Sequence, residues 1–185
     1  VKASRGLGDV YKRQIMDDGE IIWISEKDGF SHIYRNRPDG RPINQVTRGD
    51  WEVNNISAID YNNEIIYFSA KKETETEDHL YSIKFNGSRL KRLTKEKGSH
   101  SSSFSPTLNY FINSYSSLTV PPKTLIREDN GKIVRILRET DKSKFDAYNL
   151  TYPQLINIFT DDGTRPVSYT HLTLPTTLSV WISGV

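Results

Sequence analysis

The side chains of this chain that could do covalent chemistry are its four histidines and its serines and carboxylates. A serine hydrolase combines a nucleophilic serine with a histidine base and with donors for the oxyanion. In α/β-hydrolases the nucleophile lies in a Gly-x-Ser-x-Gly turn between a strand and a helix, and residues 1–185 contain no such pattern. We therefore predict no catalytic residue, no substrate-binding residue, no metal ligand and no cofactor in this chain.

Two of the histidines occur at equivalent places and two do not. His32 begins the segment His-Ile-Tyr and His79 begins His-Leu-Tyr, which favours a shared structural position at the start of a strand. His100 lies within the serine-rich run Ser99–Ser103, where pairing of a base with a nucleophile is the alternative to a structural loop. His171 lies near the C-terminal end, outside any repeated segment.

Carboxylates alternate along residues 71–78, at Glu73, Glu75, Glu77 and Asp78. Such oxygens could gather around a hard cation such as Ca²⁺, but the glycine and the spacing of an EF-hand loop are missing. A solvated hairpin tip is the interpretation we favour. Because the chain has no cysteine, disulfides and thiolate metal sites are both excluded.

The elements that must position these side chains form a repeat. The second copy follows the first at an offset of 44 residues in one block and 47 in three others. These paired blocks are Ile21–Ser25 with Ile65–Ser69, His32–Tyr34 with His79–Tyr81, Asp39–Gly40 with Asn86–Gly87, and Val46–Thr47 with Leu93–Thr94. A third and weaker copy runs through Tyr110–Ile112, Thr124–Ile126, Asn130–Gly131 and Ile136–Leu137. A period of this length, made of short β-rich runs, is typical of propeller blades.

Each copy contains four runs that suit β-strands, because they are rich in β-branched and aromatic residues. We predict that residues 20–60 and 64–106 each form a four-stranded antiparallel sheet. Asp39-Gly40 and Asn86-Gly87 are expected to be two-residue hairpin turns with positive φ at both central residues. The fold class is therefore all-β, a partial β-propeller of about three four-stranded antiparallel blades, whose two end faces are left open.

Large aromatic residues are predicted to build the core of this propeller. Trp23, Tyr67 and Phe111 are expected at equivalent buried positions of the three copies. Trp51 precedes a strand, where its ring could fill the gap between two blades. The alternative for Trp51 is a place in the wall of the central tunnel.

Both ends of the chain differ from the repeat. Residues 1–14 and 167–185 resemble translated sequencing-adapter sequence, so we predict a non-native head and tail that are detached from the fold; the alternative is a natural basic head and apolar tail. The net charge of +2 depends on the head, because the chain without residues 1–14 and 168–185 has 21 basic and 22 acidic side chains. Without a basic stripe we expect no nucleic-acid partner, and without an apolar run of about 18 residues no membrane span.

Several further blocks occur in a fixed order along the chain. They are Trp23–Tyr34, Thr47–Val53, His79–Ile83, Leu93–His100, Phe104–Pro106 and Tyr115–Pro122. Together they resemble the dipeptidyl peptidase IV branch of the prolyl oligopeptidase family of serine peptidases, over about residues 15–166. This resemblance implies an eight-bladed propeller that caps an α/β-hydrolase domain. Residues 15–152 would be its last blades, and residues 153–166, with Phe159–Thr164, the crossing into the hydrolase domain.

The resemblance also implies an activity for the whole protein. It would be a serine-type dipeptidyl peptidase that releases X-Pro or X-Ala dipeptides from peptide N-termini, in the periplasm or at the cell surface. Its partners would be the peptide substrate and its own hydrolase domain, and an oligomer is possible. No residue of the family's triad or substrate site maps onto this chain, so the fragment should be inactive and should serve as cavity wall and hinge.

A non-enzymatic periplasmic propeller that acts as a binding module is the alternative. Such propellers, related to translocation proteins, also repeat Phe-Ser-Pro and Leu-Thr. This interpretation explains the repeat but neither the block Tyr115–Pro122 nor the crossing at Phe159–Thr164. A surface-adhesion propeller is a third interpretation, with no specific residue in its favour.

Overall fold

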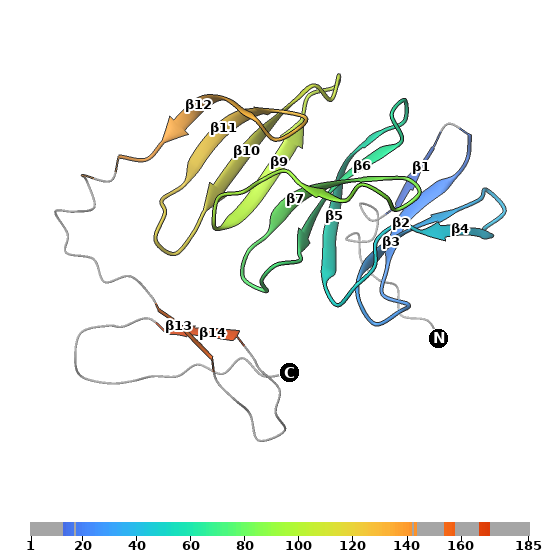
Figure 1. Ribbon diagram of the computed structural model, residues 1–185, viewed down its shortest axis with the longest axis horizontal. Helices are drawn as coiled ribbons and strands as arrows, with labels where there is room; N and C mark the ends of the chain where they lie inside the picture. The colour runs from blue at the N-terminus through green and yellow to red at the C-terminus, as the bar shows by residue number, and fades with distance from the viewer. Residues whose placement is uncertain (1–12, 17, 142, 144–153, 158–166, 171–185) are drawn as a thin grey trace, which may run out of the picture.

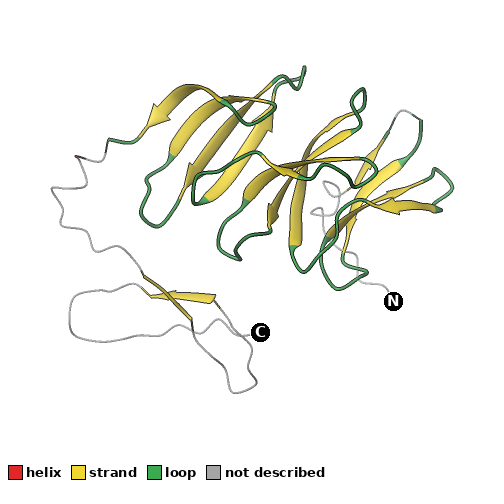
Figure 2. Cartoon of the chain, viewed as in Figure 1, coloured by secondary structure: helices red, strands yellow, loops and turns green. Residues whose placement is uncertain are grey.

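The computed structural model describes residues 13–16, 18–141, 143, 154–157 and 167–170, and the elements of this part of the chain are β-strands (Figures 1 and 2). Three four-stranded antiparallel sheets stand side by side and do not close into a ring (Figure 1). The predicted all-β class and partial propeller are thus confirmed. Over the same residues, no helix has the length and apolar character needed to cross a membrane.

Each sheet is one blade, with its strands in sequence order. The first blade contains β1 (Arg13–Ile15), β2 (Ile21–Ser25), β3 (His32–Asn36) and β4 (Pro42–Gln45). The second contains β5 (Glu52–Asp60), β6 (Ile65–Lys71), β7 (His79–Lys84) and β8 (Lys91–Arg92). The third contains β9 (Ser99–Phe104), β10 (Tyr110–Ser116), β11 (Lys123–Glu128) and β12 (Ile133–Glu139).

The predicted grouping of strands into blades was wrong by one strand. Residues 20–60 and 64–106 do not form one sheet each, because β5 pairs with β6 and β9 pairs with β10. The last strand of each predicted repeat is therefore the first strand of the next blade. A sequence period fixes the length of a repeat, but the segments 46–51 and 93–98, which cross from one blade to the next, decide where a sheet begins.

The predicted turn type was also wrong, although the turns lie where the sequence placed them. Gly40 N donates to Arg37 O, and Arg37 N donates to Arg41 O. This is a type I turn followed by a glycine in the left-handed region, with φ of 84° at Gly40 and no positive φ at Asp39. The same backbone pair closes residues 84–88 and 128–132. In each turn an Asp or Asn side chain accepts the amide two residues ahead, at Asp39, Asn86 and Asn130.

The strand register corrects the predicted aromatic positions. Trp23 pairs with Tyr34, and Phe68 pairs with Tyr81. Trp23 is therefore equivalent to Phe68, whereas Tyr67 points to the opposite face of its blade, since a slip of one residue exchanges the faces of a strand. Tyr67 and Phe111 are buried as expected, but Trp23 is only partly buried. No other blade among the described residues covers the face on which Trp23 lies.

Apolar side chains fill the space between consecutive blades. Between the first and second blades, Ile22, Ile24 and Ile33 belong to one cluster with Ile66 and Phe68. Between the second and third blades, Tyr67 and Leu80 pack with Phe104 and Phe111. Each inner face is thus buried by the neighbouring sheet.

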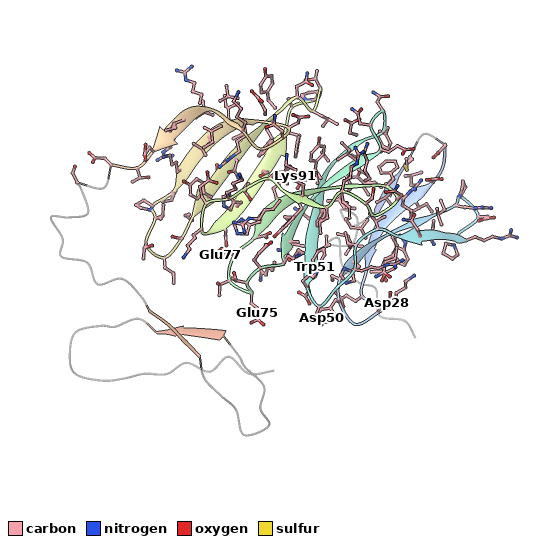
Figure 3. The ribbon with its side chains drawn as sticks, in the orientation of Figure 1. Asp28, Asp50, Trp51, Glu75, Glu77 and Lys91 are labelled. Carbon is pink, nitrogen blue, oxygen red and sulfur yellow. The ribbon has the colours of Figure 1, made fainter. Side chains whose placement is uncertain are left out.

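Trp51 joins the first two blades directly. Its ring stacks on Phe68 at 6.2 Å and meets His32 edge to face at 5.3 Å. The predicted inter-blade position of Trp51 is confirmed, and Figure 3 shows it between these sheets. Trp51 therefore contacts the first blade through His32 and the second through Phe68.

The ends of the chain are described only in part. Arg13 and Gln14, assigned above to a detached head, pair with β2 as the edge strand of the first blade, so that expectation fails for these two residues. Val167–Thr170 (β14) pairs with Gln154–Asn157 (β13) in a sheet of their own and completes no blade. The segment Phe159–Thr164 and His171 lie outside the described residues, and whether the ends are native stays a prediction.

Backbone contacts set the spacing between blades at the turn glycines. A Cβ added to Gly87 would lie 2.9 Å from Val46 O of the first blade, and one added to Gly131 would lie 2.3 Å from Leu93 O of the second. At Gly40, in the first blade, a Cβ would meet nothing within 4 Å. The second and third turns therefore pack against the segment that leaves the preceding blade.

We predict that Gly131→Ala destabilises the protein more than Gly40→Ala. Both substitutions place alanine at positive φ, which costs about 1–2 kcal/mol, but only Gly131→Ala also forces a methyl group into the carbonyl of Leu93. Overpacking of this kind adds roughly 1–3 kcal/mol. Urea unfolding followed by circular dichroism measures both losses. Equal losses would show that the turn does not set the blade spacing.

Candidate functional site

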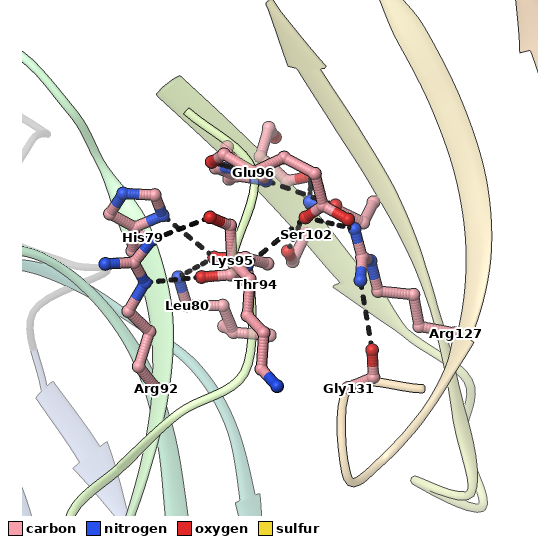
Figure 4. A network of polar contacts seen from close by, with 12 residues as sticks. His79, Leu80, Arg92, Thr94, Lys95, Glu96, Ser102, Arg127 and Gly131 are labelled. Atoms are coloured by element: carbon pink, nitrogen blue, oxygen red, sulfur yellow. Dashed lines mark hydrogen bonds and ion pairs between the residues drawn. The ribbon is translucent and has the colours of Figure 1, made fainter. Parts of the chain in front are cut away.

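The polar side chains that the sequence singled out converge between the second and third blades. We call this group the polar seam: His79 of β7, Thr94 and Glu96 of the crossing segment 93–98, His100 of β9, Asn113 of β10 and Arg127 of β11 (Figure 4). Of these six side chains, only Glu96 belongs to a residue that is not buried. The seam therefore lies inside the propeller rather than on its surface.

A histidine–threonine pair occurs in both of the first two blades. Thr94 Oγ1 accepts the amide of Leu80 at 3.0 Å and lies 3.1 Å from His79 Nδ1. In the first blade, Thr47 Oγ1 accepts the amide of Ile33 at 2.9 Å and lies 3.2 Å from His32 Nδ1. The predicted shared structural role of the two histidines is confirmed by this identical geometry.

The hydrogen-bond partners define the tautomer of both rings. Gly49 O and Glu77 Oε2, which face Nε2 of the two rings, can only accept, so Nε2 carries a proton and in the neutral ring Nδ1 accepts from the threonine hydroxyl. His32 Nε2 then donates to Gly49 O at 2.9 Å, and His79 Nε2 donates to Glu77 Oε2 at 3.1 Å. Neither ring has a free nitrogen with which to activate a nucleophile, so this pair fastens the crossing segment to the blade.

Both ring nitrogens of His100 face partners other than the serines around it. Its Nδ1 faces Asn113 Oδ1 at 3.2 Å, and its Nε2 faces Glu96 O at 2.8 Å. The ring stacks on Tyr115 with centroids 4.9 Å apart. Burial lowers the pKa of His100, and the contacts to Glu96 O and Asn113 oppose this only in part. The base–nucleophile pairing considered for His100 is therefore not formed.

Arg127 contributes a buried guanidinium to the polar seam. Its side chain is 3% exposed, and it donates to Asn113 Oδ1 at 3.2 Å, to Gly131 O at 3.0 Å and to Glu96 Oε2 at 2.7 Å (Figure 4). Burial alone would raise the pKa of Glu96, but the hydrogen bond and charge of Arg127, with backbone amides, lower it. The guanidinium of β11 thus holds β10 through its hydrogen bond to Asn113 and the crossing segment through its ion pair with Glu96.

Asp78 lies beside the polar seam and borders two hollows of about 360 and 270 Å³. Its Oδ2 accepts Asn54 Nδ2, while its Oδ1 is buried with no hydrogen-bond partner among the described residues. Burial raises the pKa of Asp78, and Asn54, Lys71 and the two neighbouring histidines oppose this rise. The smaller hollow is lined mainly by Asn and Ser side chains of β5 and β9, so it presents a polar surface along the first strands of two blades.

The other carboxylates of residues 71–78 do not converge on one point. Glu73 accepts the Tyr81 hydroxyl, which, with burial as the larger cause, raises the pKa of Tyr81. Glu77 contacts His79, and Glu75 is exposed (Figure 3). Over the part of the chain that the structure describes, no three His, Asp or Glu side chains gather as metal ligands. The arrangement gives no support to the calcium interpretation.

Sequence reasoning predicted no site residue, and it missed the core of the polar seam. By register, Asn113 occupies the place of Phe68, and Arg127 the place of Ile83. Polar residues at positions that are apolar in the preceding repeat are the signal that could have revealed them. The third copy is only weakly similar to the first two, and the copies were aligned by their apolar runs. The alignment therefore did not show that Asn113 and Arg127 stand at positions that are apolar in the preceding repeat.

A sequence model of the dipeptidyl peptidase IV (DPP IV) N-terminal region matches residues 10–122. The chain belongs to this family. The match begins within residues 1–14, which the sequence assigned to the non-native head. It ends before the third blade is complete.

Similar proteins agree with this membership. A dipeptidyl peptidase 4 of Trichophyton tonsurans is 30% identical over 162 residues, covering 85% of this chain and 20% of the relative. A probable dipeptidyl-aminopeptidase B of Emericella nidulans is 35% identical over 149 residues, covering 76% of this chain and 16% of the relative. The crystal structure of Porphyromonas gingivalis dipeptidyl peptidase 4 has a TM-score of 0.80 at 24% identity and covers 87% of this chain and 23% of its own, so it supports the fold. The chain spans about a fifth of the length of the curated relatives it matches.

We predict that Arg127→Met is strongly destabilising. Removing one partner of a buried ion pair costs about 3–5 kcal/mol, and the lower end applies here because the side chain of Glu96 is 29% exposed and can be hydrated. Lys132→Met is the matched control, since its pair with Glu128 is exposed and contributes roughly 0–1 kcal/mol. Urea unfolding compares the two. If Arg127→Met lowers the free energy of unfolding as little as Lys132→Met does, the ion pair of Arg127 with Glu96 does not stabilise the packing of these blades.

We also predict an acid-sensitive contribution from His100. Its pKa in the fold lies below 6.5, so between that folded pKa and about pH 6.5 the unfolded chain binds more protons, and the free energy of unfolding decreases as the pH is lowered. The raised pKa of Asp78 has the opposite effect, because above its ordinary pKa of 3.8 the folded chain binds more protons and the free energy of unfolding decreases as the pH rises. The lowered pKa of Glu96 has the same effect as that of His100, but near and below pH 4.5.

Substitution of His100 separates its contribution from those of Asp78 and Glu96. We expect His100→Gln to reduce the dependence of the unfolding free energy on pH below 6.5. Measurement at pH 8, where His100 is neutral, gives the loss that comes from the contacts alone. Parallel pH profiles for both proteins would refute a buried neutral histidine.

Proposed function

We propose that these blades form part of the cavity wall, and the link to the hydrolase domain, of a serine exopeptidase that releases N-terminal X-Pro or X-Ala dipeptides. The observation that supports this proposal is that the chain belongs to the DPP IV N-terminal region family and folds as an open arc of propeller blades. Several similar proteins are named as dipeptidyl peptidases. A periplasmic or cell-surface location is part of the proposal and rests on the family resemblance.

The described side chains support a structural role in that enzyme. The histidines of the first two blades are held by Thr47 and Thr94, and His100 is held by Asn113 and Glu96 O. A general base must reach the proton that it removes, and these rings are engaged in holding the backbone. The blades therefore contribute shape and rigidity to the enzyme, while the chemistry belongs to another domain.

The polar hollow along β5 and β9 suits the wall of a water-filled passage. Its lining consists mainly of small hydroxyl and amide side chains, among them Asn55, Ser57 and Ser102. Such groups can hydrogen-bond an extended peptide, or the water around it, without selecting for a particular peptide sequence. We propose that peptides pass along this surface on their way to the catalytic domain.

We predict that the isolated chain is inactive and that a chimera is active. Incubated with a Gly-Pro chromogenic substrate, the fragment should release only background product. Placed in a complete family member in exchange for the equivalent blades, it should restore a closed ring and activity. The control chimera carries Arg127→Met, which should lower activity in proportion to the loss of folded protein.

The outcomes separate the candidate functions. Activity of the fragment alone, abolished by changing one serine to alanine, would overturn the structural role. A well-folded but inactive chimera would count against a place in the peptidase and favour the non-enzymatic binding module. Folding of the chimera is checked by its melting curve, so that failure to fold is not read as loss of function.

A further inference from the structure

One carboxylate borders the polar hollow between the second and third blades. The hollow has a volume of about 270 Å³ and lies along β5 and β9, where Asp78, Leu80 and His100 line it together with Asn and Ser side chains. Both of the blades that border it are part of this chain. The hollow is therefore distinct from the open faces of the first and third blades.

Asp78 gives this hollow a negative charge. The pKa of His100 lies below its ordinary value of 6.5, so the ring is neutral at pH 7, and the remaining lining side chains are amides, hydroxyls and one leucine. Lys71 and the two neighbouring histidines act on Asp78 through space, but no lysine or arginine belongs to the lining. The wall of the hollow thus attracts a cation.

The carboxylate of Asp78 is only partly satisfied by its neighbours. Asn54 Nδ2 donates to Oδ2 at 2.5 Å, whereas Oδ1 is buried and has no hydrogen-bond partner among the described residues. Burial raises the pKa of Asp78, as it does for a carboxylate whose charge has lost its water without full compensation. A ligand that is both a cation and a hydrogen-bond donor supplies what this group lacks.

Packing of the blades does not require a carboxylate at this position. Ser31 occupies the equivalent place between the first two blades, because Ser31 O accepts Val53 N as Asp78 O accepts His100 N, each at 2.8 Å. Both residues also precede the histidine of their blade directly. The main-chain hydrogen bond is thus common to both junctions, whereas the carboxylate occurs only at the second.

An ammonium group suits this hollow better than a metal ion. Ca²⁺ takes about six to eight oxygen ligands, and no three His, Asp or Glu side chains of the described residues gather as metal ligands. An ammonium group has several N–H donors and no acceptor. Asp78 and the hydroxyls of Ser57 and Ser102 offer it acceptors within one lining.

We propose that the hollow at Asp78 binds the primary ammonium group of peptides that pass along β5 and β9. The inference rests on the proposed function, which supplies the peptides, but the site itself needs no catalytic domain. Asp78 accepts the ammonium group, and the amides and hydroxyls beside it hydrogen-bond the first peptide units. A fixed negative charge on the wall raises the local concentration of such peptides in the passage.

Titration calorimetry of the full chain with three short peptides tests the site. The first probe is Gly-Pro-Ala amide with a free amino terminus, and the second is the same peptide N-acetylated. The acetylated peptide should bind about tenfold more weakly or worse, because it loses a hydrogen bond between charged groups. The third probe is N-acetylated Gly-Pro-Lys amide, which shows whether a lysine side chain can supply the ammonium group in place of the amino terminus.

Substitutions in the hollow locate the binding. Asp78→Asn keeps the shape of the side chain and an acceptor for Asn54 but removes the charge, so it should weaken binding of the free peptide by a similar factor. Glu75→Gln is the matched control, because it removes one charge from an exposed residue of the same loop and should leave binding unchanged. Ser57→Lys places an ammonium group of the chain itself in the hollow and should block binding. Circular dichroism establishes that the variants are folded.

Two results would overturn the inference whatever the variants do to stability. One is equal binding of the free and the two acetylated peptides, and the other is an equal effect of Asp78→Asn and Glu75→Gln, as net charge alone would give. If the chimera is active but the chain does not bind the free peptide, the proposed function stands and this site fails. If the chain binds it through Asp78 but a folded chimera is inactive, the site stands and the role in the peptidase fails.

Discussion

Packing of one blade on the next is the interaction on which the rest of this structure depends. Most middle strands of the blades carry apolar residues on both faces, as in β6, where Ile66 and Phe68 point to the first blade and Tyr67 to the third. A sheet of this kind is stable only when both faces are covered. The order of the blades, the burial of the core and the rigidity of the polar seam all follow from this requirement.

Polar contacts hold the segments that join each blade to the next. Thr47 and Thr94 hold the crossing segments through the same pair of contacts to a histidine and an amide. In the third blade Arg127 reaches back to Glu96 of the preceding crossing segment and also donates to Asn113 of its own blade. This ion pair joins the second and third blades, whereas Trp51 joins the first two.

Much of the fold could be predicted from sequence, because strands and turns repeat at nearly constant spacing. The period could not show that β5 belongs with β6, since sheet pairing depends on the path of the segment 46–51. It also misplaced Trp23, because the apolar runs match best at an offset of 44, whereas the pairing of Trp23 with Tyr34 and of Phe68 with Tyr81 gives an offset of 45. The polar seam escaped prediction because Asn113 and Arg127 are polar where the pattern expects apolar residues. The contacts of Arg127 with Asn113 and Glu96 also join residues that are 14 and 31 positions apart in sequence.

The hairpins at residues 37–41, 84–88 and 128–132 have the same length and the same backbone closure in every blade. The loops at the other ends of these strands differ, with β2 and β3 separated by residues 26–31, and β6 and β7 by the longer acidic segment 72–78. One rim of the propeller is thus uniform, while the loops of the opposite rim differ in length and charge and share one backbone hydrogen bond to the next blade, from Val53 N to Ser31 O and from His100 N to Asp78 O. Only the last residue of each such loop is held by the neighbouring blade in this way, so the rest of the loop can change in length and charge without altering how the blades stack.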